Sequence, residues 1–273
     1  MESATQLASG LCSLFLLGSV GTVGVRATIR AQALPQVPAA SASAPASSST
    51  QLTLEDRADI FMARKSYSDA LDYYGRALRQ NPSDKVVSSK IWNKIGIAYQ
   101  QDDQLALARK AYNKAIHFNE KMAEAWNNMG TTYFFENKYK KSLKYYQHAI
   151  AIDPNSPSFH VNLGTSYSRI KQYAEAVDEY RVALTLDPTV LAQFGGNGTV
   201  VQPRQVDADY FFYLAKVFAS LGRTAEAVRY LRRSFEEGFD NFKKLDEDPD
   251  FVKISKDPIY GELRSNPPVA IKD

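Results

Sequence analysis

Residues 123–156 read AEAWNNMGTTYFFENKYKKSLKYYQHAIAIDPNS, and this stretch decides the fold. Its first half carries Trp126, Gly130 and Tyr133 at helical spacing, and its second half carries a small residue, an aromatic residue and another small residue. The same pattern returns five times along the chain, with a period of about 34 residues. A period of that length predicts a stack of similar units that contact only their neighbours, rather than a globular enzyme.

Each unit divides into two helical patterns of about 13 residues joined by a short polar turn. The apolar residues of the first pattern fall at i, i+3 and i+7, as they do in an amphipathic helix. Small side chains such as Gly130 and Ala149 let two antiparallel helices approach closely, and large aromatic side chains fill the space between them. Truncating Trp126 is therefore expected to cost about 3–5 kcal/mol if its ring is well buried.

With these motifs the sequence resembles the tetratricopeptide repeat family, in particular exported or membrane-tethered bacterial members. The second copy, with Trp92, Gly96 and Tyr99, matches the family pattern as closely as the third. The resemblance covers about residues 51–241 and implies an all-α fold, a right-handed α-solenoid of helix-turn-helix repeats with a C-terminal helical cap. The five repeats are expected at about 51–84, 89–122, 123–156, 157–190 and 208–241.

Two insertions interrupt the period. Lys85–Ser88 adds four residues, about one helical turn, so that a longer next helix keeps its apolar face in phase. Residues 191–207 add a longer, glycine-rich stretch, which we expect to leave the stack as a loop. This loop is either a tolerated insertion or a flap over the groove of the array.

After Gly238 the period ends, and we expect capping helices at 242–264 and a tail at 265–273. Two aspartate-proline pairs each place an N-cap residue before a proline, and they predict short helices at Pro249–Ser255 and Pro258–Arg264. A solenoid needs such a cap because its terminal apolar face otherwise meets water. The side chains expected to cover the last repeat are Phe251, Ile254, Ile259 and Leu263.

The first fifty residues differ from the repeats in composition. The uncharged run Leu11–Val25 suits the apolar core of a secretory signal, so residues 1–33 are expected to be a signal peptide or an N-terminal membrane anchor. A misplaced start or another type of leader is a third interpretation. Residues 34–50 are rich in Pro, Ala and Ser and carry no charge, which predicts a disordered linker. We therefore expect a protein that is exported (periplasmic or secreted) or tethered to a membrane by its N-terminus.

Composition and motifs argue against catalytic chemistry. The 273 residues carry a formal net charge of only +3, which is too small to argue for a nucleic acid partner. The single cysteine, Cys12, lies in the leader. The three histidines share no metal-ligand spacing, and the sequence has no phosphate loop, nucleophile elbow or paired-carboxylate motif. We expect no enzyme activity, catalytic residue, metal, cofactor or nucleic acid partner.

Four lysines between 138 and 144 alternate with tyrosines, in the manner of a nucleic-acid patch. Tyr139 and Tyr146 recur at the same phase in other repeats, however, so helix packing explains them. The lysines then favour a solvated helix face, with a binding patch as the alternative.

In the tetratricopeptide repeat family the first helix of each repeat builds the concave face, so the resemblance places the binding site there. The candidate groove residues are Lys90, Asn93, Ile97, Asn127, Asn128, Thr131, Phe134, Phe135, Asn162, Thr165 and Phe212. Amides near aromatic rings suit an extended peptide, because an asparagine can both donate to main chain and accept from it. In some members of the family, asparagines at the positions of Asn128 and Asn162 bind peptide main chain. The family's basic clamp for chaperone tails is not matched, because Glu55 and Asp59 occupy two of its positions.

The sequence thus predicts a non-catalytic protein–protein interaction scaffold that binds an extended peptide or a partner helix in the groove of repeats two to four. Two alternatives stay open. In the first, the protein is a structural module that self-associates through its fifth repeat and cap. In the second, it is an accessory subunit of an envelope enzyme or secretion assembly. The expected partner is a protein or peptide, and the membrane is involved only through an uncleaved N-terminal segment.

Overall fold

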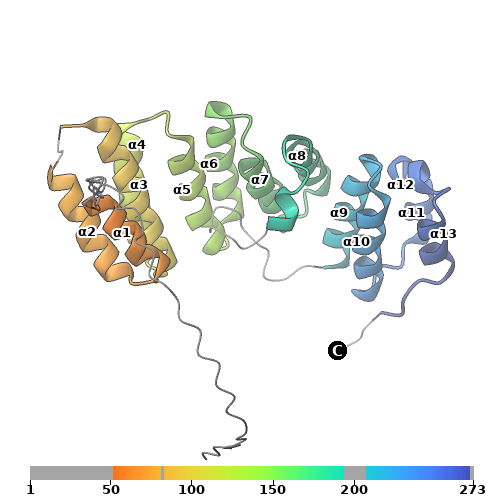
Figure 1. Ribbon diagram of the computed structural model, residues 1–273. Helices are drawn as coiled ribbons and strands as arrows, with labels where there is room; N and C mark the ends of the chain where they lie inside the picture. Colours follow the sequence, from red (N-terminus) through yellow and green to blue (C-terminus); the bar gives the residue numbers. More distant parts are fainter. Residues whose placement is uncertain (1–51, 81–82, 194–206, 271–273) are drawn as a thin grey trace, which may run out of the picture. The chain divides into compact units, whose positions relative to one another are not determined.

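The computed structural model describes residues 52–80, 83–193 and 207–270, and within them the chain is a succession of helices without a β-strand (Figure 1). In chain order the helices are α1 (Leu54–Ala63), α2 (Tyr67–Gln80), α3 (Lys85–Gln101), α4 (Leu105–Phe118), α5 (Ala123–Phe135), α6 (Tyr139–Ile152), α7 (Pro157–Arg169), α8 (Tyr173–Leu186), the 3-10 helix η1 (Val190–Gln193), α9 (Ala208–Ser220), α10 (Thr224–Glu236), α11 (Phe242–Glu247), α12 (Pro249–Ile254) and α13 (Pro258–Ser265). The predicted all-helical solenoid is confirmed. The predicted leader and linker, and most of the predicted loop, lie outside the described residues. None of the helices described is both long and apolar enough to span a bilayer.

Helices α1 to α10 form five hairpins, in which the odd-numbered helix is the first of its repeat and the even-numbered helix the second. Each first helix packs against the second helix of its own repeat, and each second helix contacts the first helix of the next repeat. Neighbouring first helices also touch, since α3 contacts α5 and α5 contacts α7. This last set of contacts brings the candidate groove residues of successive repeats together.

A buried tyrosine fills the space within each of the central hairpins. Tyr112, Tyr146 and Tyr180 are at most 2% exposed, and each lies against a glycine of the paired first helix. Burial raises the pKa of Tyr146 and Tyr180 above the usual value for a phenol, which keeps both hydroxyls neutral. Trp126 is only half-buried, so truncating it is expected to cost less than the roughly 3–5 kcal/mol of a well-buried ring.

Replacing Gly96 with alanine is expected to destabilise the protein. A Cβ at Gly96 would lie well inside van der Waals contact with the ring of Tyr112, and overpacking of this kind costs about 1–3 kcal/mol. At Gly164 the nearest atom lies 3.1 Å away, so the same change should cost less. Gly75 is the matched control, because its Cβ would meet only the tip of Arg79 at 3.7 Å. Urea unfolding should rank the variants Gly75→Ala, Gly164→Ala, Gly96→Ala from most to least stable, and a neutral Gly96→Ala would contradict this packing.

The two helices of every repeat meet through the same turn. The residue that follows each first helix by two positions has a left-handed backbone, with φ between 58° and 70°. These residues are Lys65, Asp103, Asn137, Lys171 and Gly222. The next amide bonds back to the last turn of the first helix, as Lys138 N–H does to the Tyr133 carbonyl at 2.9 Å. This hydrogen-bonded C-cap fixes the angle at which each second helix begins.

The extra residues Lys85–Ser88 form the first turn of α3, which has 17 residues where α5 has 13. The carboxylate of Asp84 caps this turn by accepting from the amides of Val86 and Val87, at 2.9 and 3.0 Å. The four added residues therefore extend the helix and leave its remaining turns in register with the other repeats.

The cap has three helices, whereas the sequence predicted two. The unpredicted helix, α11, begins where the Asn241 side chain accepts from the amide of Lys244 at 3.0 Å. Helix α12 packs on α9, and α13 packs on α10. Phe251, Ile254 and Leu263 are buried as expected, but the prediction for Ile259 is wrong, because it is 51% exposed. Tyr260 takes its place in the core, since one residue rotates the side chain by about 100° around a helix.

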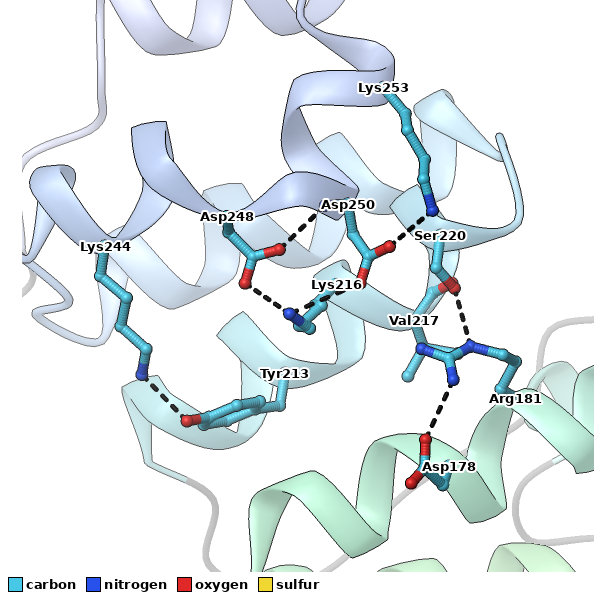
Figure 2. A network of polar contacts seen from close by, with 10 residues as sticks. All are labelled: Asp178, Arg181, Tyr213, Lys216, Val217, Ser220, Lys244, Asp248, Asp250 and Lys253. Carbon is cyan, nitrogen blue, oxygen red and sulfur yellow. Dashed lines mark hydrogen bonds and ion pairs between the residues drawn. The ribbon is translucent and has the colours of Figure 1, made fainter.

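Lys216 of α9 ties the cap to the fifth repeat (Figure 2). Its Nζ lies 2.5 Å from Asp248 Oδ2 and 3.4 Å from Asp250 Oδ2, and both carboxylates are nearly buried. Lys253 lies 2.8 Å from the other oxygen of Asp250. Burial alone would raise the pKa of Asp250, but Lys253 and Lys216 hold it below its usual value. Asp248 also caps α12 by accepting from the Asp250 amide at 3.0 Å. The ion pairs therefore hold α12 at the position where its first turn begins.

Candidate functional site

Four asparagines form a continuous hydrogen-bonded relay across the first helices α3, α5 and α7. Asn162 Nδ2 donates to Asn127 Oδ1 at 2.8 Å, and Asn127 Nδ2 donates to Asn128 Oδ1 at 3.3 Å. Asn128 Nδ2 then donates to Asn93 Oδ1 at 3.1 Å. We call these four residues the asparagine relay. Each step between helices joins residues 35 positions apart, so the repeat period itself brings the amides together.

The relay changes the interpretation of the predicted ligand-binding amides. Asn127 and Asn162 are fully buried and Asn128 is 7% exposed, so these side chains offer little or no surface to a ligand. Their amides are engaged with each other, as buried polar groups require. Asn93 is buried to the same degree, at 8% exposed, but it lies at the end of the relay and its Nδ2 has no hydrogen-bond partner among the described residues. The relay therefore ends in one nearly buried amide donor that is not engaged within the relay.

Two further candidates, Thr131 and Thr165, are also fully buried. The Thr131 hydroxyl donates to the Asn127 carbonyl at 3.2 Å and shares a hydrogen bond with the Tyr146 hydroxyl. The Thr165 hydroxyl accepts from Tyr180 at 3.0 Å. These threonines satisfy the buried tyrosine hydroxyls and do not form part of an exposed groove.

Phe212 is fully buried as well, which the sequence did not predict. Its ring stacks on Phe239 with 4.4 Å between centroids and lies 5.3 Å from the ring of Phe251. Both neighbours belong to the segment after α10, so the C-terminal part of the chain covers the inner side of α9. The candidate face therefore ends at the fourth repeat.

The remaining candidates are accessible and lie on α3 and at the end of α5. Lys90 is exposed, Ile97 is half-buried, and Phe135 is 42% exposed. Phe134 is buried behind Phe135, and the two rings meet edge to face at 6.3 Å. The accessible candidates are thus a cation, an aliphatic side chain and one aromatic ring on α3 and α5, two of the helices that carry the asparagine relay.

Two residues outside the predicted site extend this face. The Tyr139 ring meets Phe134 at 5.2 Å, and the guanidinium of Arg169 lies 5.2 Å from the Tyr139 centroid. Arg169 also donates to the Tyr139 hydroxyl at 3.2 Å. Tyrosine recurs at the repeat position of Tyr139, which predicted a packing role for this side chain, but the structure leaves it half-buried. We call Lys90, Asn93, Ile97, Phe135, Tyr139 and Arg169 the inner face.

The first repeat closes the inner face with an internally paired charge cluster. Lys94 Nζ lies 2.7 Å from Glu55 and 2.6 Å from Asp59, and Tyr74 donates to Asp59 at 2.5 Å. Burial alone would lower the pKa of Lys94, but the two carboxylates raise it above its usual value. The pKa of Tyr74 is raised by burial and by Asp59. These charges satisfy one another, and the charged side chains of the inner face itself are Lys90 and Arg169.

The inner face carries hydrogen-bonding, apolar and cationic groups. Within the residues described, no group of three or more His, Cys, Asp or Glu side chains is placed to hold a metal ion. The face presents the exposed ring of Phe135 and the cations Lys90 and Arg169, with the nearly buried amide donor of Asn93 on α3.

Replacing Asn127 with leucine should cost about 1–3 kcal/mol, because the change leaves buried amide groups of both neighbours without their relay partner. Asn93→Ala is the matched control, since Asn93 terminates the relay and only one neighbour loses a bond. Unfolding free energies from urea titration measure both changes. Equal losses for the two variants would contradict a relay in which Asn127 holds the central place.

Models of the tetratricopeptide repeat match residues 55–128, 123–156 and 145–178. Among solved structures, MamA (41-end) from Desulfovibrio magneticus RS-1 is similar, with 17% identity and a TM-score of 0.47 over 67% of this chain and 92% of that one. YrrB, titled a TPR protein with an unusual peptide-binding site, shares 17% identity at a TM-score of 0.44, over 71% and 89%. The Arabidopsis OM64 TPR domain shares 23% at 0.38, over 39% and 88%. Among curated proteins the sequence has no match.

Proposed function

Because this chain is a tetratricopeptide repeat protein, and such repeats form protein–protein interaction scaffolds, we propose that it binds an extended peptide of a partner protein along its inner face. The observation that carries the proposal is the exposed ring of Phe135 at the end of α5, the same helix that carries Asn127 and Asn128 of the asparagine relay. An aromatic anchor flanked by main-chain hydrogen bonds is a common way to hold an extended segment.

The polar part of the recognition comes from Asn93. Its carbonyl oxygen is engaged by Asn128 at 3.1 Å, which fixes the amide plane and directs Nδ2 away from the relay. A donor fixed in this way loses little conformational freedom when a peptide carbonyl binds to it. The relay thus acts on binding indirectly, by orienting the one amide that a ligand reaches.

The apolar part comes from Phe135, with Phe134 packed behind it and Tyr139 next to that ring. Burying an exposed aromatic ring is among the larger single contributions at protein interfaces. Arg169, stacked on Tyr139, adds a cation at this end of the face, and Lys90 adds one on α3. We therefore expect a bound peptide to carry one large apolar residue with acidic or neutral neighbours.

A displayed library of random peptides tests this proposal even though the partner is unidentified. The wild-type protein should enrich a family of peptides that share an apolar anchor, and Phe135→Ala should weaken their binding by about tenfold or more. Val182→Ala is the matched control, because Val182 is 41% exposed but lies on the second helix α8. Failure to enrich any family, or equal binding by both variants, would refute the inner face as the binding site.

Self-association is a second candidate function, and one observation favours it. The cap exposes Val252 and Ile259 at 54% and 51%, and both are aliphatic side chains that a monomer would leave in contact with water. Sedimentation across a dilution series tests this candidate. A monomer at every concentration would remove it, whereas a dimer that Ile259→Lys disrupts would support it.

A further inference from the structure

The second helices of repeats two and three each carry two exposed basic side chains at the same two repeat positions. Lys110 and Lys114 lie one turn apart on α4, and Lys144 and His148 occupy the equivalent positions of α6, 34 residues later. All four side chains are exposed. We call these four residues the outer patch, and it lies on different helices from the inner face.

A tryptophan lies beside the second member of each pair. The Nζ of Lys114 is 3.9 Å from the centroid of Trp92, and the ring of His148 is 3.9 Å from that of Trp126. These are the two tryptophans of the whole protein. Their recurrence in the sequence predicted a packing role, but both are half-buried and each is contacted by a member of the outer patch.

Cations from the two helices converge on one ring. The guanidinium of Arg109 lies 5.1 Å from the centroid of Tyr133, and the ammonium of Lys141 lies 5.3 Å from the same centroid. Tyr133 lies on α5 and stacks on Tyr145 of α6 at 5.1 Å. The cations of α4 and α6 therefore border the same pair of rings. Of these two cations, Arg109 is paired with a carboxylate, since it lies 2.8 Å from Glu136, and Lys141 has no acidic partner among the described residues.

The lysines of α4 and α6 have no acidic partner in the part of the chain that the structure describes. Lys110 with Lys114, and Lys140 with Lys144, are like charges spaced i, i+4, an arrangement that disfavours the isolated helix. In the flanking repeats an aspartate stands where α4 has Lys110 and α6 has Lys144, and it is paired with an arginine. Asp72 lies 3.8 Å from Arg76 in α2, and Asp178 lies 3.0 Å from Arg181 in α8. The uncompensated charge is therefore confined to two neighbouring repeats.

We propose that the outer patch binds a short acidic peptide segment of a partner protein. Helices α4 and α6 both pack on α5, and the Tyr133 ring of α5 is contacted by a cation from each, so one short segment can meet both rows of cations. Asp72 and Asp178 are each paired with an arginine, so the uncompensated positive charge ends at either side of the patch and offers nothing further to a longer polyanion. This limit favours a short peptide over a nucleic acid strand or an anionic membrane. The proposal concerns a different surface from the inner face and stands or fails independently of it.

Intrinsic tryptophan fluorescence tests the proposal, because the only two tryptophans lie against the outer patch. Titration of the full chain with synthetic hexaglutamate should give a saturable change in emission that weakens as salt is raised. The double variant Lys110→Glu with Lys144→Glu should bind the peptide about tenfold more weakly or worse. Phe135→Ala should bind hexaglutamate as the wild type does, which separates this test from that of the inner face.

The control for net charge is the double variant Arg232→Glu with Lys256→Glu, which reverses two exposed cations elsewhere on the protein and should leave binding unchanged. No saturable change with hexaglutamate, or equal loss in both double variants, would overturn the proposal. Tighter binding of an oligonucleotide of equal charge, or of vesicles of phosphatidylcholine with phosphatidylserine, would assign the patch to those ligands and overturn it too. So would a dimer that becomes monomeric in the Lys110, Lys144 variant, since a second copy would then be the occupant.

Discussion

Replacing Tyr146 with alanine should lower the free energy of unfolding by about 3–5 kcal/mol, the usual cost of deleting a fully buried aromatic ring. The ring is 0% exposed and fills the space beside Gly130, whose Cβ would come within 2.8 Å of it. Nothing else in the described hairpin of α5 and α6 is placed to occupy that volume, so the change leaves a cavity. The loss should appear as a lower midpoint in urea unfolding.

Two further variants separate the contributions to this loss. Tyr146→Phe removes only the hydroxyl, which lies 3.2 Å from Thr131, and should cost about 0.5–1.5 kcal/mol. Trp126→Ala should cost roughly half as much as Tyr146→Ala, because Trp126 is only half-buried. A loss for Trp126→Ala equal to or greater than that for Tyr146→Ala would contradict the burial described here.

Lys216→Met should release the cap from the fifth repeat and cost about 2–3 kcal/mol, because two nearly buried carboxylates lose a charged hydrogen-bond donor. Asp250 keeps Lys253, but Asp248 has no other cation within ion-pair distance among the described residues. Hydrogen exchange should accelerate first in α12 and α13, which pack on α9 and α10. Exchange in α3 to α6 should change little, since repeats contact only their neighbours.

Acid should loosen the same contact in the wild type. Because the pKa of Asp250 is lower in the folded protein than in the unfolded chain, its contribution to stability is present above about pH 3.9 and is lost as the pH falls through the folded value. Lys256→Met, on an exposed lysine of the same region, is the matched control and should leave the exchange of the cap unchanged. Unaltered exchange in Lys216→Met would show that apolar packing alone holds the cap.

Much of the fold can be predicted from the sequence, because the phase of small and aromatic residues determines which side chains meet within one hairpin. Gly130 and Tyr146 illustrate this, as does the aspartate-proline start of α12. The capping role of Asp248 is local, since it involves the amide two residues later, and local interactions can be predicted from spacing alone.

Contacts between repeats were harder to predict, because they depend on how neighbouring helices cross. The resemblance placed Asn128 and Asn162 on the inner side of the first helices, but it did not indicate that both amides would be engaged in a relay with Asn127. Likewise, His160 bonds Glu179 at 2.6 Å across two helices, a pair that no sequence spacing suggested.

Phe212 shows a third limit of sequence-based prediction. Its equivalents in the second to fourth repeats, Asn93, Asn127 and Val161, are at most 8% exposed, and in the fifth repeat it is Phe239 and Phe251 of the C-terminal segment that cover the ring. Repeat position therefore predicts which way a side chain points, while its exposure depends on the elements that pack over the last repeat.

The most direct test of the inner face as a binding site is site-specific photocrosslinking. Benzoylphenylalanine placed at Phe135, and in a second protein at Val182, is irradiated with a peptide selected by the wild-type protein. Both positions are similarly exposed, at 42% and 41%, so accessibility alone cannot separate them. We predict a crosslink from position 135 and none from position 182. A crosslink from 182 alone, or equal yields from both, would contradict binding at the inner face.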